Sequence, residues 1–170
     1  MLGKTTLSAL RALLFLAQQD RATCWSPRRL AKTLGESPTY LAKVVRHLVK
    51  TGILEAEKGA KGGVRLVRDA SGITLLDVVE ACQGTIVGDY CRSSDPNAAY
   101  CNYHRATLEL HNAITEVMGR WTLAKLLEKP YSFGVMPGGH TCFMAQGLHP
   151  ATAPAKQGTS ILVTKVGPAS

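Results

Sequence analysis

Two cysteines and a histidine form the pattern with the clearest chemical potential in this chain. Cys91 and Cys101 lie in a stretch that contains Gly and Pro, and His104 follows the second cysteine by three residues. Thiolate and imidazole groups are ligands that suit an iron–sulfur cluster, and thiols also respond to oxidants. A cysteine and a histidine three residues apart are weak evidence by themselves. The elements around them decide how much weight the pattern carries.

Positive charge is concentrated in one quarter of the chain. The 170 residues carry a net charge of +8. Residues 28–68 hold ten Lys and Arg against three acids, which accounts for +7 of that total. A local excess of this size predicts contact with a polyanion. The alternative interpretation is a solvated basic face without a partner.

The remaining composition favours a globular protein of the cytoplasm. The hydrophobic fraction of 45% is ordinary for a folded domain. No apolar run approaches the roughly 20 residues needed to cross a membrane, and Arg11 interrupts the signal-like run at residues 7–17. The odd number of cysteines, five, indicates free thiols or metal ligands and not a disulfide framework.

The elements before the cysteines predict a winged helix-turn-helix. Apolar spacing predicts a first helix at residues 6–19. Ser-Pro pairs at residues 26–27 and 37–38 start two more helices, and Gly35 ends the first of these. The second helix of this pair has a basic outward face, which favours DNA binding over an ordinary helical hairpin. Residues 53–57 and 64–67 then predict a β-hairpin, a wing with a glycine-rich, lysine-bearing tip.

The second half of the chain predicts a loop, a long helix and a tail. A capping-box variant at residues 74–77 opens a short helix that ends near Gly84. A cysteine loop at residues 83–103 leads to a long helix at residues 104–128, whose apolar positions repeat in steps of four and three. The fold class is therefore mainly α with a small β-hairpin. Residues 1–130 are expected to form one winged helix-turn-helix domain with the cysteine loop and the long helix, and residues 131–170 are expected to be a disordered tail.

At this point the chain resembles the winged-helix transcriptional regulators typified by the iron–sulfur cluster regulator and the nitric-oxide-sensitive repressor. The resemblance covers about residues 1–130. Its most specific parts are the Lys61-Gly62-Gly63 wing and the Ile73-Thr74-Leu75 segment. The matching stretches are residues 8–14, 37–41, 48–54, 59–63, 73–81 and 101–104.

The resemblance implies a homodimer on double-stranded DNA. Each recognition helix would enter a major groove and each wing would touch the flanking minor groove. Thr39, Tyr40 and Lys43 lie where base edges are normally reached, whereas Arg46, Lys50, Lys58 and Lys61 suit phosphates. The full expected DNA-binding set also includes Arg28, Ser37, Gly62 and Gly63. The expected dimerisation residues are Leu110, Ile114, Val117 and Trp121.

Two departures from the family pattern limit what can be carried over. Ala42 stands where the cluster regulator has an acidic residue, so the operator preference of that regulator does not transfer. Cys91, Cys101 and His104 match the first cysteine, the third cysteine and the histidine of the cluster ligands, but the middle cysteine is missing.

The resemblance thus implies an iron–sulfur cluster, in the form [2Fe–2S], that lacks at least one ligand. Asp89, Asp95 or Cys82 would complete the set, although Cys82 lies on the inner face of a helix. The alternatives are a thiol switch between Cys91 and Cys101, or no sensing role.

The expected function is sequence-specific transcriptional regulation, as a repressor, with sensing of redox state, iron or nitric oxide. The cysteine loop, joined to the dimerisation helix and expected near the DNA reader, would fix the spacing of the two recognition helices.

Two rival functions belong to other classes. A thiol enzyme would use Cys91 or Cys101 with His104 as base, but the chain has no phosphate loop and no room for a substrate domain. A protein-interaction module is the second rival.

Overall fold

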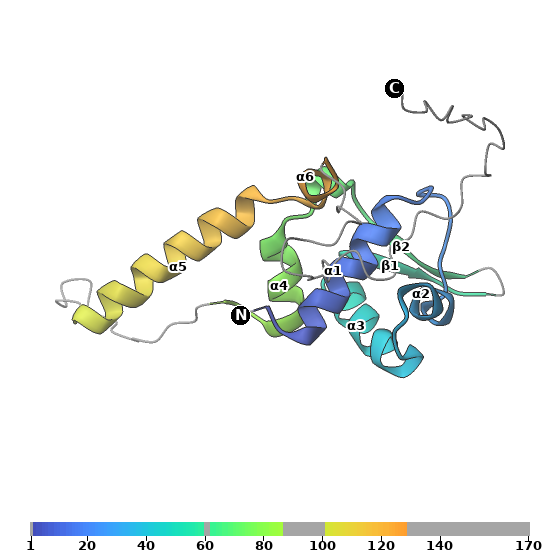
Figure 1. Cartoon of the computed structure of the whole chain (residues 1–170), viewed down its shortest axis with the longest axis horizontal. Helices are drawn as coiled ribbons and strands as arrows, with labels where there is room; N and C mark the ends of the chain where they lie inside the picture. Colours follow the sequence, from blue (N-terminus) through green and yellow to red (C-terminus); the bar gives the residue numbers. More distant parts are fainter. Residues whose placement is uncertain (1, 60–61, 87–100, 129–170) are drawn as a thin grey trace, which may run out of the picture.

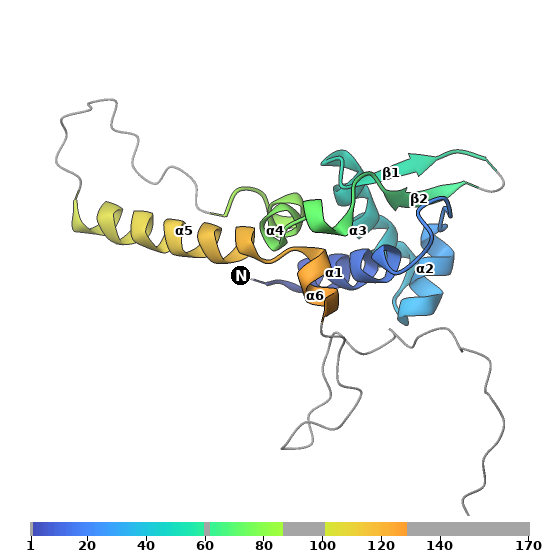
Figure 2. The ribbon, with the colours of Figure 1, turned by 90° about the horizontal axis from the view of Figure 1, so that it is seen from above.

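The computed structural model describes residues 2–59, 62–86 and 101–128. Figures 1 and 2 show a group of helices and a hairpin gathered around α1, with α5 projecting away from this group. The elements are α1 (Lys4–Ala17), α2 (Pro27–Leu34), α3 (Pro38–Lys50), β1 (Leu54–Glu57), β2 (Gly63–Leu66), a 3₁₀ turn (Ala70–Gly72), α4 (Leu75–Gln83), α5 (Asn102–Arg120) and α6 (Leu123–Glu128). The predicted fold class is confirmed. The predicted tail lies outside the described residues.

Helix α1 is the centre of the hydrophobic core. Its residues from Ser8 to Leu16 are all buried, and it packs against α2, α3, α4, α6 and β2. Leu13 is fully buried, as are Leu30 of α2 and Leu41 of α3. Burial of one such side chain contributes about 1.5–3 kcal/mol. The apolar spacing of α1 therefore positions the helix-turn-helix (α2 and α3) and the β-hairpin.

The turn between α2 and α3 has the local chemistry that the sequence predicts. Ser26 Oγ accepts a hydrogen bond from the Arg29 amide at 3.2 Å and so caps α2. Gly35 closes α2 in the left-handed conformation, with φ of 67°, which a residue with a side chain adopts only with strain. Helix α3 begins three residues later, so the turn is tight.

A buried ion pair joins this turn to α1. The Arg11 guanidinium lies 3.0 Å from the Glu36 carboxylate and also donates to the Leu34 carbonyl at 2.8 Å. The two side chains are only 7% and 10% exposed. Each charge would be costly to bury alone, so each requires the other. The same arginine that interrupts the apolar run of α1 in the sequence thus holds the helix-turn-helix on the core.

The wing is a two-stranded antiparallel hairpin tied to the start of α2. Leu54 pairs with Leu66 and Glu57 with Gly63. Trp25 extends this pairing, because its amide and carbonyl bond to the carbonyl and amide of Val64 at 3.0 and 2.9 Å. Trp25 packs edge-on against Phe15 of α1. The hairpin is therefore fixed to both α1 and α2 and not loosely attached to the surface.

The predicted long helix at residues 104–128 is wrong in one respect: it is broken. Helix α5 ends at Arg120, Trp121 has an extended backbone, and α6 begins at Leu123. The Trp121 carbonyl accepts from the Leu75 amide at 2.8 Å, and the Leu123 amide donates to the Ile73 carbonyl at 2.9 Å. Leu123 is fully buried in the core. These tertiary bonds and this burial outweigh the helical pattern that continues through the break.

The buried pair gives a test of what holds the turn. We expect Arg11→Met to lower the free energy of unfolding by about 3–5 kcal/mol, because Glu36 is then buried without its cation. Replacement of the exposed Arg21, which pairs with Asp69 at a site where both side chains are more than half exposed, by Met should cost less than about 1 kcal/mol. Urea denaturation of both variants measures the difference.

A second variant separates charge from packing. The double variant Arg11→Met with Glu36→Met removes both charges and should recover a large part of the loss. Equal losses for Arg11→Met and Arg21→Met would show that the ion pair does not hold the turn.

Candidate nucleic-acid interface

Helix α3 presents one polar, cationic face to solvent. Leu41, Val44 and Leu48 are buried against the core. The polar residues of the helix are exposed, namely Thr39, Lys43, Arg46, His47 and Lys50. Ser37, immediately before the helix, is exposed as well. This arrangement places most of the predicted reader residues of α3 on one accessible surface.

Tyr40, which the sequence predicts among the base-contacting residues, lies at the edge of this face and turns toward α1. Its hydroxyl donates to Thr5 Oγ1 at 3.4 Å, and Lys4 Nζ lies 5.4 Å from its ring centroid. The ring is half-buried and packs against the core. Tyr40 continues the apolar stripe of Val44 and Leu48, so its ring is drawn inward to α1 while Thr39 and Lys43 stay outside.

A hollow of about 420 Å³ separates α3 from the wing. The residues that line it are largely apolar, namely Ala42, Val45 and Val49 from α3 and Ala56 from β1. Arg46 also lines it. Gly62 and Gly63 also line it. A Cβ on Gly63 would come within 2.5 Å of the Trp25 backbone, so only glycine allows the hairpin this close to α2.

Lys58 is exposed directly after β1. Lys61, the other predicted wing cation, lies outside the described residues.

Carboxylates near the wing are engaged with partners of their own. Arg65 Nε lies 2.7 Å from Glu55, and Arg68 lies 3.2 Å from Asp77. Cys24 Sγ donates to the Glu57 carboxylate at 3.2 Å, and this bond raises the pKa of the thiol above its ordinary value. Within the described part of the chain, no ion pair involves the predicted DNA-binding cations Arg28, Lys43, Arg46, Lys50 and Lys58. Their charge is available to a polyanion.

Cys101 and His104 lie at the outer end of α5. Cys101 caps this helix, with its exposed sulfur accepting from the His104 amide at 3.5 Å. Both residues are remote from α3 of the same chain, because α5 projects away from the reader (Figures 1 and 2). The cysteine loop was expected near the helix-turn-helix; its last residues, at the start of α5, lie away from α3 of the same chain. Cys91, Asp89 and Asp95 are outside the described residues.

The described residues do not by themselves complete a metal site. Over residues 2–59, 62–86 and 101–128, no three His, Cys, Asp or Glu side chains come together as candidate ligands. Cys82 is half-buried at the end of α4 and packs against the core, as the sequence predicts. Burial raises the pKa of this thiol, and its hydrogen bond with Thr6 acts in the opposite direction.

Helix α5 and the residue after it carry apolar side chains that the rest of the described chain leaves exposed. Leu110 is 57% exposed, Val117 46% and Trp121 45%. Ile114, on the same face, is half-buried.

Among the described residues, none of the helices has the length and hydrophobicity that a membrane span requires.

Comparison with known proteins identifies the family. The profile of the Rrf2 family, described as an iron-dependent transcriptional regulator, matches residues 2–129. The chain belongs to the Rrf2 family of transcriptional regulators. Members of this family bind DNA, and its relatives include HTH-type transcriptional regulators, in line with the prediction that the chain is not an enzyme.

Two relatives of this Rrf2 chain cover most of its length. Protein aau3 of Rhizobium meliloti is 31% identical over 131 residues, which is 75% of this chain and 84% of the relative. The HTH-type transcriptional regulator NsrR of Halalkalibacterium halodurans is 32% identical over 123 residues, with coverage of 70% and 84%.

Solved structures show the same Rrf2 fold. CymR, the global cysteine regulator of B. subtilis, matches with a TM-score of 0.61 and 22% identity over 75% of this chain and 96% of its own. IscR of T. potens matches with a TM-score of 0.59 and 23% identity over 75% and 86%. At these identities the likeness concerns the fold.

Sequence reasoning missed two features of this Rrf2 reader. One is the Arg11–Glu36 pair, for which the charge inside an otherwise apolar helix face was the available signal. The other is the role of Arg29, whose guanidinium lies 3.9 Å from the Trp25 ring centroid. A tryptophan next to an N-cap serine offered no clear signal for this stacking.

Proposed function

We propose that this chain is a homodimeric, sequence-specific DNA-binding regulator, with α3 in the major groove and the wing on the flanking minor groove. The observation that carries the proposal is the set of exposed cations on α3 and directly after β1, which have no ion-pair partner among the described residues. Acidic side chains beside them are paired elsewhere. This surface, which includes the exposed face of α3, therefore offers uncompensated positive charge to a polyanion.

The side chains of this surface divide into two roles. Thr39 and Lys43 lie in the first two turns of α3, where a recognition helix reaches base edges. Arg46, Lys50 and Lys58 lie further along α3 or on the wing and suit phosphate oxygens, which position the protein without specifying sequence. Arg28, Ser37, Lys61, Gly62 and Gly63 complete the proposed set.

The two roles predict different consequences of substitution. Lys58→Ala should weaken binding to all duplexes alike and reduce the slope of log K against log salt by about one unit. Thr39→Ala should instead change the preference among operator sequences. Selection from a random duplex pool gives the preferred sequence, and titrations over a salt series give the slope.

Lys125→Ala serves as the control, because this exposed lysine lies on α6, away from the reader. It should leave both sequence preference and slope unchanged. A new sequence preference in Lys58→Ala would mean that the wing reads bases. If the unmodified chain did not bind duplex DNA in dilute salt, the proposed function would be contradicted.

The proposed dimer contact is the uncovered apolar face of α5. Leu110, Val117 and Trp121 are each more than two-fifths exposed, and a large apolar patch on a regulator commonly marks an interface. A second copy of the chain supplies a matching face through twofold symmetry, which palindromic operators also require. Trp121 would join this contact from the end of α5 and not from within a helix.

Charge placed on this face should separate the subunits. We expect Val117→Glu to shift sedimentation from dimer to monomer, since the glutamate would be buried without a partner. Asn112→Glu adds the same charge to an exposed position of α5 on the opposite side and should remain dimeric. A dimeric Val117→Glu variant in analytical ultracentrifugation would rule out this face.

We further propose that Cys91, Cys101 and His104 hold an iron–sulfur cluster, of the [2Fe–2S] type. Cys101 and His104 fit part of such a donor set, because a helix spacing of three residues brings an exposed thiol and an imidazole to one end of α5. The family description as iron-dependent also supports it. A bound cluster would supply a redox-responsive link between the cysteine loop and the first turn of α5.

Anaerobic purification tests the cluster directly. We expect brown protein with absorbance between about 300 and 500 nm, together with iron and sulfide. Cys91→Ala and Cys101→Ala should lose the colour. Cys24→Ala should keep it, because that thiol lies beside the wing and bonds to Glu57. Colourless, iron-free protein would contradict the proposed cluster and favour a thiol switch. A Cys91–Cys101 disulfide detected by mass spectrometry would support that switch.

A further inference from the structure

The side of α3 that turns toward the wing is apolar. Its residues recur at steps of four, three and four, which keeps them on one side of the helix, and they are Pro38, Ala42, Val45 and Val49. Val45 is buried, whereas Ala42 and Val49 are partly exposed. These three residues line the hollow of about 420 Å³ between α3 and the wing. The surface proposed for DNA therefore has an apolar side next to its cationic face.

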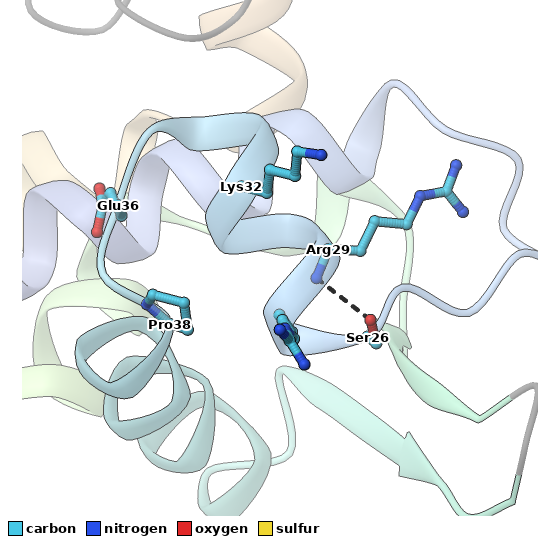
Figure 3. A pocket seen from close by; sticks show the side chains of 6 residues that line it. Ser26, Arg29, Lys32, Glu36 and Pro38 are labelled. Carbon is cyan, nitrogen blue, oxygen red and sulfur yellow. Dashed lines mark hydrogen bonds between the residues drawn. The ribbon is translucent and has the colours of Figure 1, made fainter.

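The polar groups on the lining of this hollow are engaged, with Arg46 as the exception. The Glu57 carboxylate accepts a hydrogen bond from Cys24 Sγ at 3.2 Å. Ser26 Oγ accepts the capping hydrogen bond from the Arg29 amide, which Figure 3 shows as a dashed line. Arg46 forms no ion pair within the described part of the chain. The hollow therefore offers apolar contact and one cation to the molecule that it meets.

Ala42 lies where this apolar side comes closest to the base-reading part of the helix. It is in the second turn of α3, three residues after Thr39 and four before Arg46, and both of these neighbours are exposed. The early turns of a recognition helix are the ones that reach base edges. In the proposed complex, one DNA strand separates the major groove that holds α3 from the minor groove at the wing. This strand crosses the hollow, so Ala42 meets the base edges closest to it.

The chemistry of the major groove provides one partner for an apolar side chain. Base edges there carry hydrogen-bond donors and acceptors, and thymine alone among the four bases adds an apolar group, its 5-methyl. An alanine side chain contacts that methyl group without presenting a donor or an acceptor of its own.

We propose that Ala42 selects thymine at one position of each operator half-site, through contact between its side chain and the 5-methyl group. The proposal rests on the proposed DNA-binding function and adds a base-reading residue to it. 5-Methylcytosine carries the same methyl group and is the competing source of the contact.

Removal of the methyl group alone tests the contact. In the operator selected from a random duplex pool, each thymine is replaced in turn by deoxyuridine, symmetrically in both half-sites. At one position this change should weaken binding by about fourfold for each half-site, the factor that matches burial of one methyl-sized group. Fluorescence anisotropy titrations at constant salt measure the change. Equal binding of all deoxyuridine operators would overturn the proposal, whereas failure to bind any duplex would contradict the proposed function instead.

Substitution of Ala42 assigns the contact to this residue. Ala42→Gly should bring the ratio of thymine to deoxyuridine affinity at that position close to one, because glycine has no side chain to cover the methyl group. A uniform loss of affinity, caused by glycine in a helix, cancels in this ratio. His47→Gly makes the same backbone change at an exposed position on a different side of α3 and should keep the fourfold ratio. A fourfold ratio that survives in Ala42→Gly would overturn the proposal.

Two further arms complete the test. If circular dichroism shows that Ala42→Gly does not fold, Ala42→Ser takes its place and should also lower the ratio, because its hydroxyl would lie against the methyl group. Selection from an unmethylated pool should yield a T·A pair at the position that deoxyuridine identifies. An operator without a selected T·A pair, bound more tightly when its cytosines carry 5-methyl groups, would overturn thymine and assign the contact to methylated DNA.

Discussion

The arrangement of the reader depends on the ion pair between Arg11 and Glu36. Both charged side chains are nine-tenths buried, so separating them would leave one charge in an apolar environment. The pair therefore constrains geometry more than it adds stability. It fixes the turn after α2 to the middle of α1. The orientation of α3 follows, because its first residue lies two positions beyond Glu36. The pair also compensates the negative charge of Glu36, which lies beside the cations of α2.

The wing adds a second constraint that makes the reader one preformed unit. Trp25 contacts α1 through Phe15, stacks under Arg29 of α2 and continues the pairing of β2 through Val64. Gly63 permits that close approach. Helix α2, helix α3 and the wing are thereby positioned relative to one another before DNA binds. Less ordering is then required on binding, which leaves more of the contact energy to favour the complex.

The sequence predicted the elements whose signals are local. The capping box at Thr74 and Asp77 is present with both of its hydrogen bonds, and Gly35 ends α2 as expected. The sequence did not predict outcomes that tertiary contacts decide. Tyr40 was expected among base-contacting residues, yet an aromatic ring on the stripe of Val44 is stabilised by packing on α1. The helical repeat through residue 121 did not show the break, since it arises from backbone bonds to Ile73 and Leu75.

That break also bears on how the proposed cluster at the start of α5 would act on DNA binding. Cys101 and His104 begin α5, while the other end of the helix is tied by two backbone hydrogen bonds to the segment that opens α4. Helix α4 packs in turn on α1 and α3. A helix transmits displacement along its axis as a rigid rod. Under the proposed function, a change at Cys101 would therefore reach the helix-turn-helix through Trp121 and Leu123, or through the partner subunit of the proposed dimer. Helix α5 also packs directly on α4, which provides a further route within the same chain.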